Sequence, residues 1–273
     1  MAYHCQMAGG ISAASRADLA AVVGSGRRFV SVSDVAEELG IGRPESAQRL
    51  ARWARQGWLR RVRRDLYVAV PVDAVNPEAW TIDPLVLADE LWSPCYATGW
   101  TAANHWGLTE QSFRTTVVKT TQRVRRSEVR MLGNDFLLAH ALPASMGWGL
   151  RREWRDDRRL TFADPARVVV EMLDDPRLGG GIRLAAEVLL AYLETEPPEV
   201  LVEHAESLGN RTVFKRLGYL GERLGASEEL IASCEARLSS GFPLLDPTLP
   251  RDGVRSRRWS LVVNVRIDSQ EPS

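Results

Sequence analysis

One short segment of this chain concentrates arginine, and the spacing of its apolar residues limits what the segment can fold into. Residues 48–69 read QRLARWARQGWLRRVRRDLYVA and contain seven arginines against a single acidic residue, Asp65. The whole chain, by contrast, balances 35 basic residues against 35 acidic ones. The apolar residues in this region first recur at intervals of three and four, and then nearly alternate with polar ones. That change of period predicts a helix followed by a β-hairpin.

The helical part of the segment is predicted over residues 45–56. Its apolar positions, which include Leu50, form one stripe, whereas the arginines fall on the opposite side. Pro44 suits the start of a helix, where a missing N–H costs nothing. Gly57 suits the position after the last turn, which often adopts a left-handed conformation. The complete stripe is Ala47, Leu50, Ala51 and Ala54. The result is a helix with a small apolar face and a cationic outer face, with Trp53 at its flank.

The segments on either side complete a recognisable module. Upstream, Ser33 or Asp34 is expected to cap a short helix that closes at Gly40. Only a few residues separate this helix from the next, as in a helix-turn-helix. Downstream, the hairpin turns at Arg63-Arg64-Asp65, where aspartate tolerates a positive φ. The order of these elements predicts a winged helix-turn-helix over residues 1–75.

In such a module the second helix enters the major groove of DNA, and the wing reaches the flanking backbone. Arginine suits both tasks because its planar fork matches guanine edges and phosphate oxygens. The predicted DNA-binding residues are Arg43, Ser46, Gln48, Arg49, Arg52, Arg55, Arg60, Arg61, Arg63 and Arg64. The alternatives are a purely solvated face, or a surface for RNA or another anionic partner.

The remainder of the chain predicts a second, α+β domain over residues 85–273, with a mainly antiparallel sheet and surrounding helices. Residues 71–84 contain three prolines and no helical periodicity, which is typical of a linker. Helices are expected over 85–92, 98–106 and 168–173, and again from 182 to about 240 with breaks near Pro197, Gly209 and Gly225. Strands are expected over 115–121, 136–142, 147–154, 159–162 and 259–267, the last one rejoining the sheet.

A second basic group lies in this domain. It consists of Lys119, Arg123, Arg125, Arg126 and Arg130, with Glu128 as the one counter-charge. These residues either extend the DNA contact or face an acidic partner, and the sequence does not choose between the two.

No motif indicates catalysis, a metal or a cofactor. The glycines 179–181 lack the lysine and Ser/Thr of a P-loop, and a flexible lead-in to a helix is the simpler interpretation. His105, His140 and His204 are isolated and are expected to be structural. One carboxylate group raises the alternative of a metal-dependent nuclease: Asp156, Asp157, Glu171, Asp174 and Asp175. Glu171 has no lysine in an E-x-K pattern, so we expect no catalytic residues.

The composition fits a protein that works in the cytoplasm. A hydrophobic content of 45% supports real cores over 273 residues. No apolar run is long enough to span a membrane, and the first fifteen residues do not resemble a signal peptide. The three cysteines, Cys5, Cys95 and Cys234, form no disulfide or metal pattern.

Several stretches resemble the AbiEi-type antitoxins, the regulatory half of abortive-infection toxin–antitoxin pairs. The winged helix VSVSDVAEELGIGRPESAQRLARWARQGWLRRVRRDLYVAVP carries the resemblance first. It continues through YATGWTAANHWGLTEQ, FADPARVVVEMLDDPRLGGG and LLDPTLPRDGVRSRRWSLVVNV, so that it spans most of residues 28–266. One departure is Asp65, where the family pattern leads us to expect glycine.

The resemblance implies a transcriptional autorepressor that binds repeats of double-stranded DNA in its own promoter. It also implies an antitoxin whose neighbouring gene encodes a nucleotidyltransferase-like toxin, with or without stable contact between the two proteins. The competing hypothesis is a ligand-sensing winged-helix regulator whose second domain binds a small effector, and the less favoured one is the nuclease.

Overall fold

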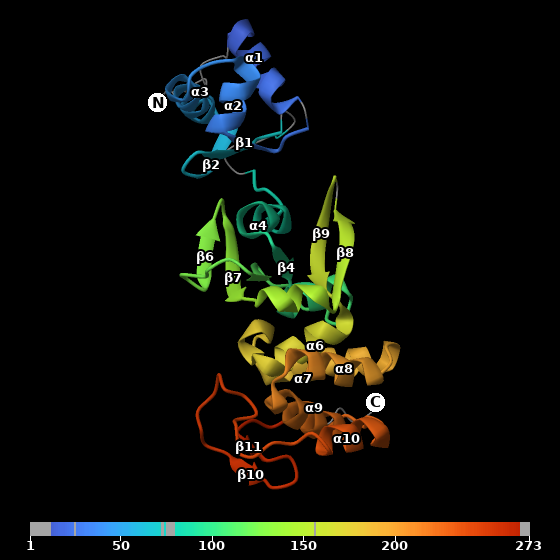
Figure 1. The fold of residues 1–273 in the computed structure, drawn as a ribbon. Coiled ribbons are helices and arrows are strands. Elements are labelled where there is room, and N and C mark those ends of the chain that lie inside the picture. The colour runs from blue at the N-terminus through green and yellow to red at the C-terminus, as the bar shows by residue number, and fades with distance from the viewer. Residues whose placement is uncertain (1–11, 25, 72–73, 75–79, 156, 268–273) are drawn as a thin grey trace, which may run out of the picture. The chain divides into compact units, whose positions relative to one another are not determined.

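A computed structural model describes residues 12–24, 26–71, 74, 80–155 and 157–267. The chain divides into two compact units (Figure 1): unit 1 comprises residues 1–82 and 131–133, and unit 2 comprises 83–130 and 134–273. Helices and strands are mixed in both, which confirms the α+β class. Within the described ranges, no helix has the length and apolar character needed to cross a membrane.

Unit 1 is a winged helix-turn-helix, as predicted. Its elements are α1 (Ala13–Val23), β1 (Phe29–Ser31), α2 (Val32–Leu39), α3 (Arg43–Arg55), β2 (Leu59–Arg63) and β3 (Leu66–Ala69). Three residues, 40–42, join α2 to α3, and the strands form an antiparallel sheet in the order β1-β3-β2. The sequence analysis did not predict α1 or β1.

The start of α2 is fixed by a capping box two or three residues earlier than expected. Ser31 Oγ accepts a hydrogen bond from the backbone N–H of Asp34, and the Asp34 carboxylate accepts one from the backbone N–H of Ser31. The cap is therefore Ser31 rather than Ser33 or Asp34. The predicted stop is confirmed, because Gly40 adopts φ of 62° in the left-handed region.

The wing carries a β-bulge that decides where its arginines point. Leu59 and Val62 are both buried although they are three residues apart, which a strict two-residue alternation cannot achieve. The pairing of β2 with β3 shifts register between Arg61 and Arg63, so that both arginines are exposed while Val62 turns inward. Asp65 has φ of 62°, which confirms the expected positive φ in the turn.

The core of unit 1 is built on Trp53, which is 1% exposed and packs with Val30, Val35, Leu50 and other apolar residues. The spacing of apolar residues in the sequence predicts Trp53 at the flank of its helix and not in the core. Helix α1 changes that outcome, because it covers this side of α3 and provides the acceptor of the indole N–H, Ser15 Oγ at 2.9 Å. The indole therefore stabilises unit 1 from within.

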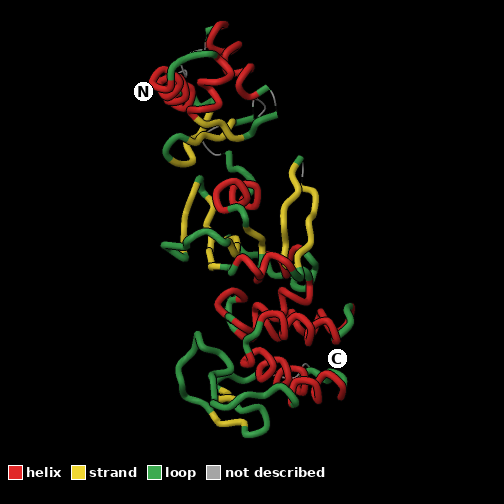
Figure 2. Tube along the Cα trace, in the orientation of Figure 1, coloured by secondary structure: helices red, strands yellow, loops and turns green. Residues whose placement is uncertain are grey.

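Unit 2 combines a six-stranded sheet with helices, most of which gather beyond one end of it (Figures 1 and 2). The strands are β4 (Cys95–Ala97), β5 (Thr115–Thr120), β6 (Glu128–Met131), β7 (Asn134–His140), β8 (Leu150–Arg155) and β9 (Arg158–Ala163). The order is β6-β7-β5-β4-β9-β8; β4–β5 and β8–β9 are antiparallel, whereas β4–β9 and β5–β7 are parallel.

The helices of unit 2 follow the predicted breaks. They are α4 (Pro84–Trp92), α5 (Gly99–His105), α6 (Pro165–Asp174), α7 (Ile182–Thr195), α8 (Glu199–Leu208), α9 (Arg211–Arg223) and α10 (Glu228–Glu235), with short 3₁₀ turns η1 (Pro143–Gly147) and η2 (Pro176–Gly179). The gaps after α7, α8 and α9 fall at Pro197, Gly209 and Gly225, as expected from the local chemistry of these residues.

The expectation that residues 259–267 rejoin the sheet is wrong. In the structure β11 (Leu261–Val263) pairs with β10 (Val254–Ser256) in a separate two-stranded sheet. The reason is Trp259, whose buried ring lies so close to α9 that a Cβ on Gly218 would come within 2.0 Å of it. Its indole N–H donates to Glu222 at 2.7 Å, so this segment is anchored to α9 and not to a sheet edge.

A buried carboxylate, Glu171 of α6, lies at the centre of unit 2. It accepts hydrogen bonds from Tyr96 Oη at 2.8 Å and from Thr98 Oγ1 at 2.6 Å. It also lies 3.0 Å from Arg167 Nε and 3.3 Å from Lys119 Nζ. All five residues are buried, so strands β4 and β5 are tied to α6 through one side chain.

Arg167 extends this network to the loop before β8. Its guanidinium donates to the carbonyl oxygens of Ser145 and Trp148 and lies 4.0 Å from the centre of the Trp148 ring. Asp164 caps α6 by accepting from the backbone N–H of Arg167 at 2.8 Å, and it pairs with His204 at 3.0 Å. The Asp-Pro-x-Arg stretch thus has a structural role: its aspartate caps the start of α6, and its arginine is buried in the core.

The Glu171 network predicts a large loss of stability when its charge is removed. Glu171→Gln leaves Lys119 and Arg167 buried without a counter-charge, which we expect to cost about 3–5 kcal/mol of unfolding free energy. Urea unfolding of the full chain measures this loss. Glu203→Gln, at an exposed position of α8, is the control and should change the free energy by less than about 0.5 kcal/mol. Equal effects of the two substitutions would contradict a central role for Glu171.

The same network predicts how stability depends on pH. Burial by itself raises the pKa of Glu171, but Lys119, Arg167 and the two hydroxyl donors outweigh it and hold that pKa below its usual 4.5. The folded state therefore binds a proton on Glu171 less readily than the unfolded state does. The stability that this carboxylate contributes should be complete above pH 4.5 and should decline as pH falls through the lowered pKa. Unfolding of wild type and Glu171→Gln at decreasing pH tests this: the gap in free energy should narrow, and a gap that widens in acid would refute it.

Candidate nucleic-acid interface

The exposed face of α3 presents polar and cationic side chains in one row. Gln48, Arg52 and Arg55 are exposed and recur at intervals of four and three, so they share a face of the helix. Among the described residues, neither arginine of this row has an acidic partner. Both are therefore available to an anionic ligand such as a DNA phosphate or a guanine edge.

Arg43 opens α3 beside this row. It is exposed, and its Nη1 donates to Ser33 Oγ of α2 at 2.8 Å. The contact bridges the two helices of the helix-turn-helix with a neutral partner, and among the described residues Arg43 forms no ion pair at the start of α3.

The prediction that Ser46 contacts DNA is wrong. Ser46 is fully buried, and its hydroxyl donates to the carbonyl oxygen of Gly42 at 3.0 Å. The buried positions of α3 are Ser46, Leu50 and Trp53, whereas Ala51 is exposed. Because Trp53 is the largest apolar side chain of the helix, the buried stripe is rotated toward it and away from the alanines that the sequence analysis had favoured.

Arg49 is tied to carboxylates within unit 1. It forms ion pairs with Asp18 of α1 and with Glu45 one helical turn earlier, the second at 3.0 Å, and its side chain is 27% exposed. Asp18 escaped the sequence analysis because no periodicity predicted α1. The acidic residue at position 18, in a stretch with helical composition, was the only available signal. In this arrangement Arg49 positions α3 against α1, and Arg52 is the freer cation.

The wing divides its four arginines between two roles. Arg61, Arg63 and Arg64 are exposed. Arg61 Nε donates to the carbonyl oxygen of Arg63 at 3.4 Å, and the acidic contact found among the described residues is a long one of 3.9 Å between Arg64 and Asp65. Arg60 is half-buried and donates to the carbonyl oxygen of Trp80. The first three can reach phosphates, whereas Arg60 attaches the chain that follows the wing to unit 1.

One of the five residues of the second basic group is not at the surface. Lys119 is 8% exposed and paired with Glu171, so the prediction of a surface contact is wrong for this residue. Its place on β5 turns its side chain toward α6. The other members, Arg123, Arg125, Arg126 and Arg130, are exposed in and after the β5–β6 loop, and Arg130 lies 3.6 Å from Asp135.

The three isolated histidines occupy different settings. The His105 ring stacks on Phe162 with 3.9 Å between ring centres, and His204 pairs with Asp164. His140 ends β7 at an exposed position. Within the described ranges, no three or more His, Cys, Asp or Glu side chains lie close enough together to hold a metal ion.

Three of the carboxylates that raised the nuclease alternative, Glu171, Asp174 and Asp175, are engaged in structural contacts. Glu171 accepts from four groups, Asp174 accepts from Asn210 at 2.6 Å, and Asp175 pairs with Arg177 at 2.7 Å. Asp156 lies outside the described residues. The glycines before α7 likewise serve structure: Asp246 accepts the first helical N–H, that of Ile182, at 2.8 Å and occupies the position that an external anion would take.

Comparison with known proteins supports the resemblance found in the sequence. Residues 17–70 match a family described as "Transcriptional regulator, AbiEi antitoxin", so the match covers α1 through the wing. No protein of curated function matches the chain. The crystal structure of the RV2827C protein from Mycobacterium tuberculosis is similar in fold, with a TM-score of 0.63 and 18% identity over 91% of this chain and 90% of that one.

Substitution of α3 and wing residues should separate base recognition from phosphate contact. Arg52→Gln should weaken binding to the cognate duplex by about 1–3 kcal/mol and relax its sequence preference. Arg63→Gln should weaken binding to cognate and random duplexes alike and lower the salt slope by about one unit.

Two controls accompany these binding measurements, which are made by fluorescence anisotropy across salt concentrations. Arg183→Gln removes an exposed arginine from α7 of unit 2, and Ser46→Ala removes only a buried hydroxyl. Both should bind the cognate duplex as wild type does once folding is verified. Unchanged binding by Arg52→Gln and Arg63→Gln would show that the arginine face is merely solvated.

Proposed function

We propose that this chain, whose residues 17–70 form the winged helix of an AbiEi-type antitoxin and transcriptional regulator, represses its own operon and neutralises the toxin encoded beside it. One observation carries the proposal: the matched segment is also the segment in which Arg52, Arg55 and Arg63 are exposed without an acidic partner among the described residues. In a regulator this surface is the part that meets double-stranded DNA, and the protein would act in the cytoplasm.

The geometry of unit 1 supports a specific mode of binding. Helix α3 would lie in the major groove with Gln48 and Arg52 toward base edges, since both belong to its exposed row. Arg61, Arg63 and Arg64 of the wing would contact phosphates beside the groove. Arg49, which is paired with Asp18, would fix the orientation of α3 relative to α1 and would not itself contact DNA.

The antitoxin role rests on unit 2 and on the resemblance of its motifs. The Asp-Pro-x-Arg stretch starts α6, and the Trp-x-Leu-x-x-Asn stretch places Trp259 and Leu261 in the core. Asn264 then binds the carbonyl oxygen of Asp246 at 2.8 Å. Because these motifs build a fold and no catalytic arrangement, we propose that unit 2 acts by binding and not as an enzyme, and that its partner is a nucleotidyltransferase-like toxin.

A separation-of-function variant tests both activities in the full chain. We expect Arg52→Gln combined with Arg63→Gln to lose repression of a reporter driven by the native promoter, since base and phosphate contacts are both removed. The same variant should still rescue cells that express the neighbouring toxin gene from an unrelated promoter. Growth and reporter output are the measurements, and Arg183→Gln is the control that keeps both activities.

Three results would contradict parts of the proposal. Full repression by the double variant would show that α3 and the wing do not provide the DNA-binding surface. Failure of the wild-type chain to rescue growth would remove the antitoxin role. Magnesium-dependent cleavage of the operator by the purified chain would replace the proposal with the nuclease alternative.

A further inference from the structure

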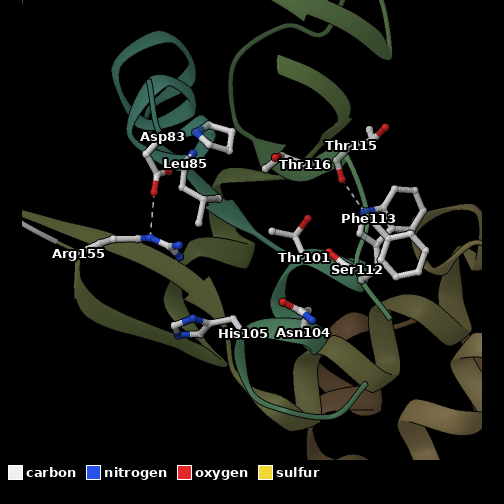
Figure 3. A pocket seen from close by; sticks show the side chains of 12 residues that line it. Asp83, Leu85, Thr101, Asn104, His105, Ser112, Phe113, Thr115, Thr116 and Arg155 are labelled. Carbon is white, nitrogen blue, oxygen red and sulfur yellow. Dashed lines mark hydrogen bonds and ion pairs between the residues drawn. The ribbon is translucent and has the colours of Figure 1, made fainter. Parts of the chain in front are cut away.

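Unit 2 contains a cavity of about 310 Å³ that the proposed function does not use (Figure 3). It lies among the start of α4, the helix α5, the start of β5 and Arg155 at the end of β8. A volume of this size lies at the lower end of the range for small-molecule sites. The side chains that line it come from segments far apart in the sequence, and their free polar groups converge on the same space.

The strongest of these groups is the Arg155 guanidinium. Its Nε lies 2.9 Å from Asp83 Oδ2, and the other oxygen of Asp83 accepts from the backbone N–H of Leu85 at 2.7 Å as the cap of α4. Asp83 thus holds the guanidinium by one edge. Figure 3 shows the other end of that guanidinium turned toward the cavity, and no second acidic partner is found for it among the described residues.

A nearly buried hydroxyl also opens onto the cavity. Thr116 is 6% exposed, and its hydroxyl has no hydrogen-bond partner within the part of the chain that the structure describes. Since Thr116 lines the cavity, its hydroxyl is open to that space and can donate to a molecule that enters it.

Asn104 adds a fixed acceptor. Its amide nitrogen donates to the carbonyl oxygens of Thr109 at 3.4 Å and Gln111 at 3.2 Å, which uses both of its hydrogens. The side-chain oxygen of Asn104 is therefore left to accept from a ligand. The cavity thus combines a cationic donor, a hydroxyl and one amide acceptor.

The wall opposite Arg155 is aromatic (Figure 3). Trp100 and Phe113 stack with 5.0 Å between ring centres, and the indole N–H donates to the carbonyl oxygen of Thr115 at 2.6 Å. That hydrogen bond fixes the indole plane. Phe113 keeps 36% of its surface exposed, so an apolar group entering the cavity would cover it.

From this arrangement we propose that the cavity binds a small planar organic oxyanion. Arg155 would hold its carboxylate or phosphate group, because the guanidinium fork matches the oxygens of either. Thr116 would donate to the same end, and the flat apolar part would lie against Trp100 and Phe113. The site would make unit 2 a sensor in addition to its role toward a toxin, and it does not depend on the proposed function.

Three probes that share a phenyl ring test the proposal on the full chain by isothermal titration calorimetry. Benzoate presents a carboxylate, phenyl phosphate a phosphate, and benzamide a neutral amide in place of the carboxylate. We expect at least one of the two anions to bind at least about tenfold more tightly than benzamide, a difference of about 1.4 kcal/mol. Preference for benzoate or for phenyl phosphate identifies which oxyanion the site takes, and either result supports it.

Variants then locate the binding. Arg155→Gln should weaken binding of the preferred anion by at least about tenfold. Thr116→Val, which keeps the shape of the side chain, should weaken it severalfold even if Arg155→Gln unfolds. The matched control is Arg152→Gln on β8, an exposed arginine outside the cavity, which should bind as wild type does. Equal binding of benzamide, no saturable binding of any probe, or wild-type affinity in Thr116→Val would overturn the proposal.

Discussion

The carboxylate of Glu171 is the constraint on which unit 2 depends. Two cations and two hydroxyls converge on it, from β4, β5 and α6, in a site that water does not reach. A charge in such a place is tolerated only when each partner is present, because removal of one leaves another uncompensated. The sheet and α6 must therefore form together, and the loop carrying Trp148 follows because Arg167 reaches it.

Unit 1 applies the same principle to a surface. Arg49 has the carboxylate of Asp18 within reach and joins α3 to α1. Arg52 and Arg63 have no acidic partner among the described residues, and their side chains are exposed to solvent. The overall charge of the chain is balanced. The uncompensated arginines of α3 and the wing are therefore a local concentration of positive charge and do not reflect a general excess of it.

Local chemistry predicted much of this fold. The helix-turn-helix, the turn at Asp65 and the breaks after α7, α8 and α9 were all found, because glycine, proline and aspartate act on the backbone within a few residues. The errors arose where distant segments decide. Trp53 is buried because α1 covers that side of α3, Ser46 lies on the same buried face of the helix, and Trp259 leaves the sheet because Gly218 makes room for it on α9. The periodicity of apolar residues along the sequence does not predict contacts between such distant segments.

The candidate site shows the same limit more sharply. The cationic segment was recognised from the sequence, but Arg49, Arg60 and Lys119 have partners that are 31, 20 and 52 residues away along the chain. Glu45, one helical turn from Arg49, is the local partner among them. Similarity of fold to another protein does not supply these partners, since at 18% identity it shows the architecture alone. The role of each arginine in such a chain therefore depends on whether the folded protein already pairs it with a carboxylate or a carbonyl oxygen. The arginines that have no such partner are the ones whose side chains can contact DNA.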